Sequence, residues 1–265
     1  MKTFDLDKMP ELIKILFKIQ QTLADTNSKE TLRINHKKID ELLQQTQILV
    51  VWKDLLHKRR PDLPKELIPE IFMDAYISVA FACMGMYKQA NVSLRGELET
   101  ALRLVYFSTH HVEFRWWYKK EKNKGEADYL RRNDPLSESY AYFRQLEEIR
   151  NFQEKCKEEG HKIILFDEIG KLYGKLSQFV HSSVSSFQTT SHRFSPRYDK
   201  EKFKSWVKNF EEAQRYVNTI MILGFKKEFL ALNIDIQKKI LKVVGDKNYK
   251  KGLRKSLPLK FRGQI

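Results

Sequence analysis

Two segments of the sequence carry polar side chains four residues apart, the spacing that places side chains on one face of a helix. The first segment contributes Arg95, Glu99 and Arg103, and the second contributes Tyr173, Ser177 and His181. A histidine, with an ordinary pKa of about 6.5, can transfer protons at cellular pH, and an arginine can hold and neutralise a phosphate. The two stripes therefore predict a candidate site for proton transfer beside a bound phosphate.

The same residues also have structural interpretations. His181 ends a predicted helix and leads into the serine-rich segment 182–196, where a substrate could reach it, but it could equally bind the last carbonyls of its own helix. Glu99 could orient Arg95, or the two could form an ordinary surface ion pair that contributes about 0.3–0.5 kcal/mol. Spacing alone leaves these alternatives open.

Residues 172–183 read Leu-Tyr-Gly-Lys-Leu-Ser-Gln-Phe-Val-His-Ser-Ser. This run resembles the Tyr-x-x-Leu-Ser-x-x-x-His segment of the helical HEPN-like proteins, a superfamily rich in prokaryotic defence and toxin effectors. Residues 94–106 are similar to an Arg-x-x-x-Glu helix found upstream in some branches of that superfamily. The resemblance covers approximately residues 71–183.

The resemblance implies a helical bundle, often dimeric, whose ribonuclease members use an Arg-x(4–6)-His motif. His181 fills the histidine position, but only Lys175 stands where the arginine is expected, and lysine cannot hold a phosphate in a bidentate way. We therefore expect Arg95 to supply the guanidinium from the neighbouring helix, with the Cα atoms of Arg95 and His181 within about 14 Å of each other, in one chain or across a two-fold dimer. A second match, Arg103 with His110, has six residues between the pair and ranks lower.

The function implied by the resemblance is metal-independent RNA cleavage in a prokaryotic defence or toxin–antitoxin system. Histidine would take the proton of a ribose 2′-OH, and arginine would stabilise the charge that develops on the phosphate. The expected partners are RNA, a cognate antitoxin or defence-system protein, and a second copy of the chain. The catalytic set is His181, Arg95, Glu99, Ser177 and Tyr173. The alternative is a non-catalytic helical module that binds nucleic acid or a partner protein.

Basic side chains elsewhere are candidates for contact with RNA. Arg115, Lys119 and Lys120 interleave with an aromatic cluster, which predicts either stacking on bases or packing in a core or dimer contact. The predicted RNA-binding residues are Lys175, Arg103, Arg115, Lys119 and Lys120.

The composition of the 265 residues narrows the class of protein. A formal net charge of +15 favours nucleic acid as a partner, and a hydrophobic content of 42% excludes a disordered chain. With 10 Gly and 7 Pro the chain has few turns, which argues against an all-β fold. We find no Walker loop, dinucleotide fingerprint or zinc helix, so no cofactor and no metal is expected.

Apolar residues recur with the helical period along most of the chain, which predicts an all-α, HEPN-like bundle with additional N-terminal and C-terminal helices. A strand could form only at 162–166. Helices are expected near residues 12–23, 28–60, 70–89, 92–122, 137–159, 166–182, 199–232 and 235–244.

These elements predict four regions. They are an N-terminal helical segment (1–68), a bundle core (69–198), C-terminal helices packed on the core (199–245) and a basic tail (246–265) that is flexible or loosely docked. Only Cys83 and Cys156 are present, and no signal peptide or bilayer-spanning segment is recognised. A cytoplasmic location without membrane contact is therefore expected.

Overall fold

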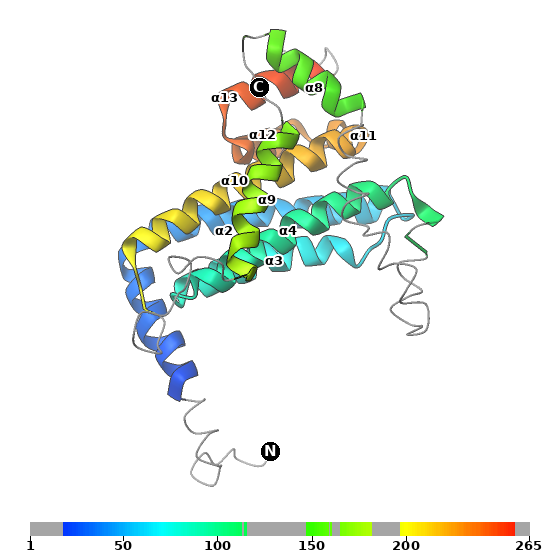
Figure 1. Cartoon of the computed structure of the whole chain (residues 1–265). Coiled ribbons are helices and arrows are strands. Elements are labelled where there is room, and N and C mark those ends of the chain that lie inside the picture. Colours follow the sequence, from blue (N-terminus) through cyan, green and yellow to red (C-terminus); the bar gives the residue numbers. More distant parts are fainter. Residues whose placement is uncertain are drawn as a thin grey trace.

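The described part of the chain folds into helices joined by turns and short links (Figure 1). The computed structural model describes residues 18–112, 114–115, 147–158, 160, 165–181 and 197–257, and within these ranges no strand occurs. The predicted all-α class is confirmed. The elements are η2 (Thr22–Asn27), α2 (Ser28–Arg59), α3 (Leu67–Cys83), α4 (Tyr87–Phe107), α8 (Glu147–Glu158), α9 (Leu165–His181), α10 (Lys200–Gly224), α11 (Lys226–Leu230), α12 (Ile234–Val244) and α13 (Lys247–Ser256).

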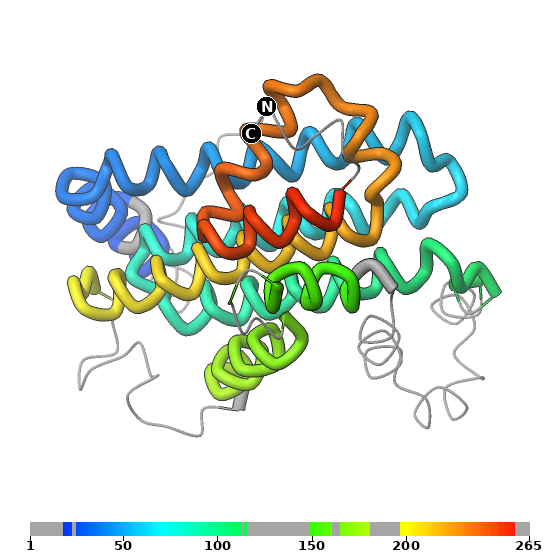
Figure 2. Tube along the Cα trace, turned by 90° about the horizontal axis from the view of Figure 1, so that it is seen from above, coloured from blue at the N-terminus to red at the C-terminus, as the bar shows by residue number. Residues whose placement is uncertain are grey.

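Four long helices, α2, α3, α4 and α10, lie roughly alongside one another and enclose the core (Figures 1 and 2). Helix α4 packs against α3, α9 and α10, so it lies at the centre of the bundle. Helix α9 crosses α4 steeply (Figure 1). This crossing brings side chains that are some seventy residues apart in sequence to one seam.

The break between α3 and α4 lies earlier than the sequence pattern predicts. Helix α3 ends at Cys83 and α4 begins at Tyr87, whereas helices were expected over 70–89 and from 92. Gly85 has a φ of 76°, and a Cβ on it would lie 2.7 Å from the carbonyl oxygen of Arg197. Glycine is therefore needed here for two reasons: it adopts the positive φ of the turn, and it leaves room for the backbone of Arg197.

The start of α2 also differs in detail from the sequence expectation. Separate helices were expected near 12–23 and 28–60, but the chain is already helical through η2 and Asn27 makes no capping hydrogen bond. Instead, the Asn27 amide donates to the carbonyl of Met84 at 3.1 Å. The asparagine therefore ties the N-terminal helix to the α3–α4 corner.

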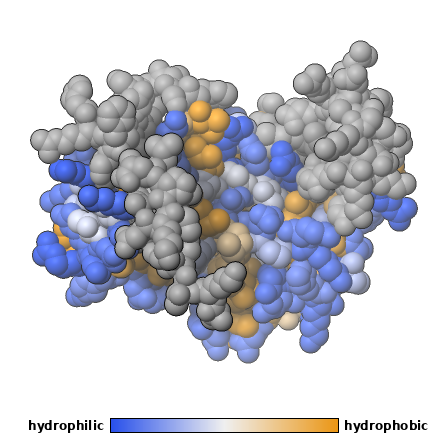
Figure 3. Space-filling view, turned by 90° about the horizontal axis from the view of Figure 1, so that it is seen from below, coloured by the Kyte–Doolittle hydropathy of each residue, from blue (hydrophilic) through white to orange (hydrophobic). Residues whose placement is uncertain are grey.

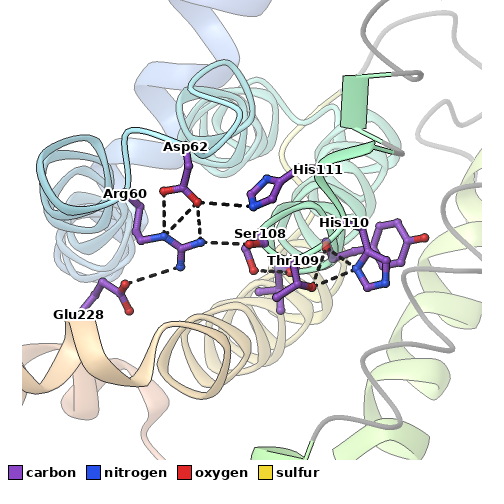
Figure 4. A network of polar contacts seen from close by, with 9 residues as sticks. Arg60, Asp62, Ser108, Thr109, His110, His111 and Glu228 are labelled. Atoms are coloured by element: carbon purple, nitrogen blue, oxygen red, sulfur yellow. Dashed lines mark hydrogen bonds and ion pairs between the residues drawn. The ribbon is translucent and has the colours of Figure 1, made fainter.

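Helix α4 ends at Phe107, well before residue 122, to which the sequence pattern extended it. An arginine network holds the residues just after this end (Figure 4). Arg60, at the end of α2, binds Asp62 at 2.8 Å, donates to the carbonyl of Ser108 at 3.0 Å and lies 3.6 Å from Glu228. One guanidinium thus joins α2, the end of α4 and α11.

The predicted basic tail begins with a helix. Asp246 caps α13 by accepting from the backbone N–H groups of Asn248 and Tyr249, and α13 packs against α8 beside it (Figure 2). At the contact, a Cβ on Gly252 would lie 2.2 Å from the sulfur of Cys156. Helix α13 is therefore closely docked; residues 258–265 lie outside the described ranges.

Across the described part of the chain, none of the helices combines the length and apolar character needed to cross a bilayer.

Candidate functional site

The seam between α4 and α9 brings an arginine, a tyrosine and a glutamate into direct contact. The Arg95 Nη2 donates to the Tyr173 hydroxyl at 2.7 Å, and that hydroxyl donates to Glu99 Oε1 at 2.7 Å. Arg95 Nη2 also lies 2.8 Å from the same carboxylate oxygen. The guanidinium carbon stands 4.9 Å from the centre of the Tyr173 ring. Three polar groups therefore fix one another across two helices.

The packing of α9 on α4 produces this arrangement. The inner face of α9 consists of buried side chains at helical spacing, Leu165, Ile169, Leu172, Leu176 and Phe179. Helix α4 is covered on several sides, since Val105 packs against Gly224 of α10 and Gly96 against Asp74 of α3. Arg95 and Glu99 lie on the side of α4 that α9 covers, and Tyr173, next to the buried face of α9, meets them there.

The cluster is partly shielded from water. The side chain of Arg95 is 23% exposed and that of Glu99 is 17% exposed. Burial acts to lower the pKa of Arg95, but Tyr173 and Glu99 outweigh it and raise the pKa. Burial, followed by the bond to Glu99, raises the pKa of Tyr173. Arg95 is therefore a cation and Tyr173 a neutral donor.

Arg103 continues the polar stripe one turn further along α4. Its Nη2 lies 4.0 Å from Glu99 Oε2, so one carboxylate is flanked by two guanidinium groups. The Nε atoms of Arg95 and Arg103 are buried and have no hydrogen-bond partner among the described residues. Both guanidinium groups therefore retain a donor not used within this part of the chain.

Two further carboxyl groups lie next to the seam, and sequence reasoning missed both. Glu97 is fully buried and accepts from the Gln214 amide at 2.7 Å, and Asp74 packs over Gly96. Burial raises the pKa of Glu97 well above its usual range, and burial together with Glu70 and Glu99 raises the pKa of Asp74 to about 6. A signal was present, because Glu97 lies on the apolar stripe of its helix.

Two residues of the predicted site make internal hydrogen bonds. The hydroxyl of Ser177 donates to the carbonyl of Tyr173 at 2.8 Å, a bond within its own helix. The amine of Lys175 donates to Asn209 Oδ1 at 2.6 Å, and the buried Asn209 donates in turn to Asn91. Lys175 thus points towards α10, and its amine helps to satisfy a polar group in the core.

The remaining predicted residues are placed as follows. His181 is the last residue of α9; its side chain, and the whole of Lys119 and Lys120, lie outside the described residues. Arg115 is exposed. His110, the lower-ranked histidine, stacks on Tyr106 with ring centres 4.1 Å apart.

The geometry supports anion binding more directly than any other chemistry. A half-buried guanidinium in fixed orientation, with a second arginine about two turns further along the helix, can hold a phosphate oxygen. Within the described ranges, no group of three or more His, Cys, Asp or Glu is arranged to hold a metal ion. Comparison with known protein families, curated proteins and solved structures finds no match to this chain.

Proposed function

We propose that the chain is a metal-independent ribonuclease effector of a prokaryotic defence or toxin–antitoxin system, acting in the cytoplasm through the α4–α9 seam. One observation carries the proposal: Arg95 is bound to Tyr173, on the same helix that ends in His181. Helix geometry puts residue 181 about 12 Å beyond residue 173 along the α9 axis. A phosphodiester held at Arg95 and running along α9 would lead towards the histidine.

The chemistry assigns one role to each group. His181 removes the proton of a ribose 2′-OH, and the oxygen attacks the adjacent phosphorus while the bond to the 5′-oxygen breaks and that oxygen takes up a proton. Arg95 stabilises the additional negative charge on the phosphate, and Glu99 and Tyr173 hold the guanidinium in place. Arg95 is the residue expected to touch the phosphate; Glu99 and Tyr173 are positioning residues.

A cleavage assay with matched variants tests the proposal. Against labelled RNA, His181→Ala should lower the cleavage rate about 10²–10⁴-fold with RNA affinity nearly unchanged, because a general base contributes a factor of this size. Arg95→Ala should lower both the cleavage rate and the affinity for RNA. Lys171→Ala, on an exposed position of α9, is the control and should cleave like the wild type.

Two results would contradict a nuclease: no RNA cleavage by the wild type under any activating condition, or a His181→Ala protein as active as the wild type. A cellular version of the same test expresses each variant in a bacterial host. Toxicity relieved by His181→Ala, and not by Lys171→Ala, supports cleavage.

The second candidate is a non-catalytic module that binds RNA, a cognate antitoxin or another defence-system protein. One observation favours this candidate: Arg95 Nη2 already contacts both Tyr173 and Glu99, so both of its N–H groups are engaged within the protein. In this case the trio stabilises the α4–α9 packing. Binding of RNA without cleavage, unaffected by His181→Ala, would select this candidate.

The proposal includes a homodimer. Apolar side chains reach the surface on the side of the molecule shown in Figure 3, and on α3 the side chains of Met73 and Tyr76 are 42% and 47% exposed. Met73 and Tyr76 lie three residues apart and so share one face of α3, and adjoining exposed apolar side chains of this kind mark contact surfaces. Light scattering after gel filtration should give twice the mass of one chain for the wild type. For Met73→Lys the measured mass should be that of a single chain.

A further inference from the structure

A strongly basic surface lies on the C-terminal helices, away from the α4–α9 seam. Residues 226–257 contain ten Lys or Arg and three acidic residues, Glu228, Asp235 and Asp246. Glu228 lies 3.6 Å from Arg60, and Asp246 is bound to the backbone of α13. The C-terminal basic face comprises Lys238, Lys239 and Lys242 of α12 and Lys247, Lys250, Lys251, Arg254 and Lys255 of α13.

The fold turns these charges away from the buried side of α13: Lys247 and Lys251 are exposed, and Lys250, Arg254 and Lys255 are half-buried. Tyr249, Gly252 and Leu253 are buried at the α13–α8 contact and lie on one side of the helix. At 100° per residue, all five basic residues of α13 fall within an arc of about 140° on the opposite side. Helix α12 repeats the arrangement, with its inner residues Ile240, Leu241 and Val244 buried and its three lysines exposed.

The chemistry of this face points to a phosphate backbone. Lysine is a compact point charge that neutralises phosphates without reading bases. The only aromatic residue of α13, Tyr249, is buried, so the face offers no ring on which an unpaired base could stack. Protein partners usually need aromatic or apolar anchors, which the outer arc of α13 lacks. An amphipathic helix that binds membranes needs an exposed apolar side, and that of α13 is covered by α8.

Helix α9 connects this face to the candidate site. In its first turn, Glu168 accepts a hydrogen bond from the hydroxyl of Tyr249 on α13 and another, at 3.4 Å, from the hydroxyl of Tyr216 on α10. From Glu168 the helix continues for thirteen residues to His181, which corresponds to about 20 Å. The basic face and the end of α9 are therefore held at a fixed separation by one rigid element.

We propose that the C-terminal basic face binds the phosphate backbone of a base-paired RNA stem. Together with the proposed function, on which this last step rests, the geometry makes the substrate a stem-loop RNA. The stem lies on α12 and α13, and the unpaired loop reaches the α4–α9 seam. The stem-binding surface itself does not depend on whether the protein cleaves RNA.

Binding is tested with the full-length chain and a 2′-O-methyl RNA duplex of about 16 base pairs, which cannot be cleaved through a 2′-hydroxyl. The test variant is Lys242→Gln/Lys247→Gln/Lys250→Gln. The control, Lys37→Gln/Lys58→Gln/Lys208→Gln, removes the same charge from exposed positions on α2 and α10. Fluorescence anisotropy is measured between 0.05 and 0.3 M salt, with the matching single strand and phosphatidylserine vesicles as further probes.

We expect the wild type to bind the duplex more tightly than the single strand. In the test variant the Kd should rise at least tenfold at 0.1 M salt, and the slope of log K against log salt should decrease by about 2 to 3, since each lost phosphate contact accounts for about 0.9. The control should change the Kd less than threefold.

The proposal is overturned if the two variants bind alike, if the single strand binds as tightly as the duplex, or if vesicles bind through the same three lysines. If the wild type binds the duplex as expected but cleaves no RNA, the nuclease proposal fails and the stem-binding face stands.

Discussion

At the scale of single residues, the ion pair between Arg95 and Glu99 differs from an ordinary ion pair on a helix surface because a third residue fixes its geometry. Arg95 and Glu99 have the spacing of an ordinary helix ion pair, but Tyr173 comes from another helix and bonds to both. The tyrosine hydroxyl accepts from the cation and donates to the carboxylate, so each bond polarises the next. This third partner is what restricts the guanidinium to one orientation.

Tyr173→Phe should distinguish the role of the Tyr173 hydroxyl in positioning Arg95 from the role of the ring in packing. It removes both hydrogen bonds of the hydroxyl but keeps the ring under the guanidinium, so the free energy of unfolding should fall by only about 1 kcal/mol. If the seam cleaves RNA, the cleavage rate should drop at least tenfold and the KM should change little. Lys171→Ala, at an exposed position of the same helix, is the control for both measurements. An unchanged rate in Tyr173→Phe would contradict the positioning role.

Asp74 is predicted to make stability depend on pH. Burial and two nearby carboxylates raise its pKa from 3.8 to about 6, so the folded state keeps the proton where the unfolded state loses it. The contribution of this group to stability is therefore fully present below pH 4 and is lost as the pH rises to about 6. Asp74→Asn, which cannot ionise, should exceed the wild type by about 1–2 kcal/mol at pH 7.5, after allowance for solvent screening, and match it near pH 4.

Chemical denaturation at pH 4, 5, 6 and 7.5 measures this difference. The matched control is Glu154→Gln, an exposed carboxylate on α8. A gap between Asp74→Asn and the wild type that stayed constant from pH 4 to pH 7.5 would show that the carboxyl group has an ordinary pKa in the folded protein.

At the scale of elements, substitution of two helical glycines by alanine is predicted to change the free energy of unfolding in opposite directions. A Cβ on Gly252 would meet Cys156 at 2.2 Å and Phe152 at 2.9 Å, so Gly252→Ala should separate α13 from α8 and lower the free energy of unfolding by about 1–3 kcal/mol. A Cβ on Gly174 has nothing within 4 Å, so Gly174→Ala should raise it by about 0.5–1 kcal/mol through helix propensity.

Hydrogen exchange resolved by segment distinguishes the two effects. In Gly252→Ala, protection should be lost first in α13 and α8, while α2, α3 and α4 remain protected. A uniform loss over all helices, or equal stability of the two variants, would show that the α8–α13 contact is looser than the structure indicates.

The sequence predicts elements best where one periodic pattern decides them. Helix α2 was expected over 28–60 and occurs at Ser28–Arg59, and α12 was expected over 235–244 and occurs at Ile234–Val244. The predicted start of α4 was too late because the chain turns at Gly85, where its backbone packs against that of Arg197, a residue distant in sequence. Helix α13 was missed because its lysines obscure two well-spaced apolar residues.

The candidate site could be predicted only in outline. Stripes of four-residue spacing placed Arg95 and Tyr173 at the edges of two apolar faces, and the burial of each face follows from the pattern alone. The partners of these faces do not follow from it: Val105 of the α4 stripe packs at Gly224 of α10. The bonds from Lys175 to Asn209 and from Gln214 to Glu97 likewise join helices whose relative register no local pattern specifies.

At the scale of the whole molecule, α10 holds the other helices together through buried amides. Asn218 accepts from the indole of Trp52 on α2 at 3.1 Å, and Asn209 joins Asn91 on α4 to Lys175 on α9. These bonds lie between helices far apart in sequence. The molecule should therefore unfold as one cooperative unit.

Asn209→Leu tests this coupling. It leaves Asn91 Oδ1 without its donor in the core and removes the acceptor of Lys175, so the free energy of unfolding should fall by about 2–4 kcal/mol while the transition stays single. Asn151→Leu, at an exposed position of α8, should change it by less than about 0.5 kcal/mol. Circular dichroism and calorimetry should give the same midpoint; two separated transitions would contradict the single unit.

The tight contact under α13 has a practical consequence for thiol chemistry. Cys156 lies buried beneath Gly252, where burial raises the pKa of its thiol to about 12, and burial raises that of Cys83 to about 11. At neutral pH both are almost entirely in the unreactive thiol form, and the chain has no other cysteine. A single exposed cysteine, introduced by Lys247→Cys or Lys58→Cys, should therefore react with a maleimide dye much faster than either native thiol. This difference in rate allows site-specific fluorescent labelling with Cys83 and Cys156 left in place.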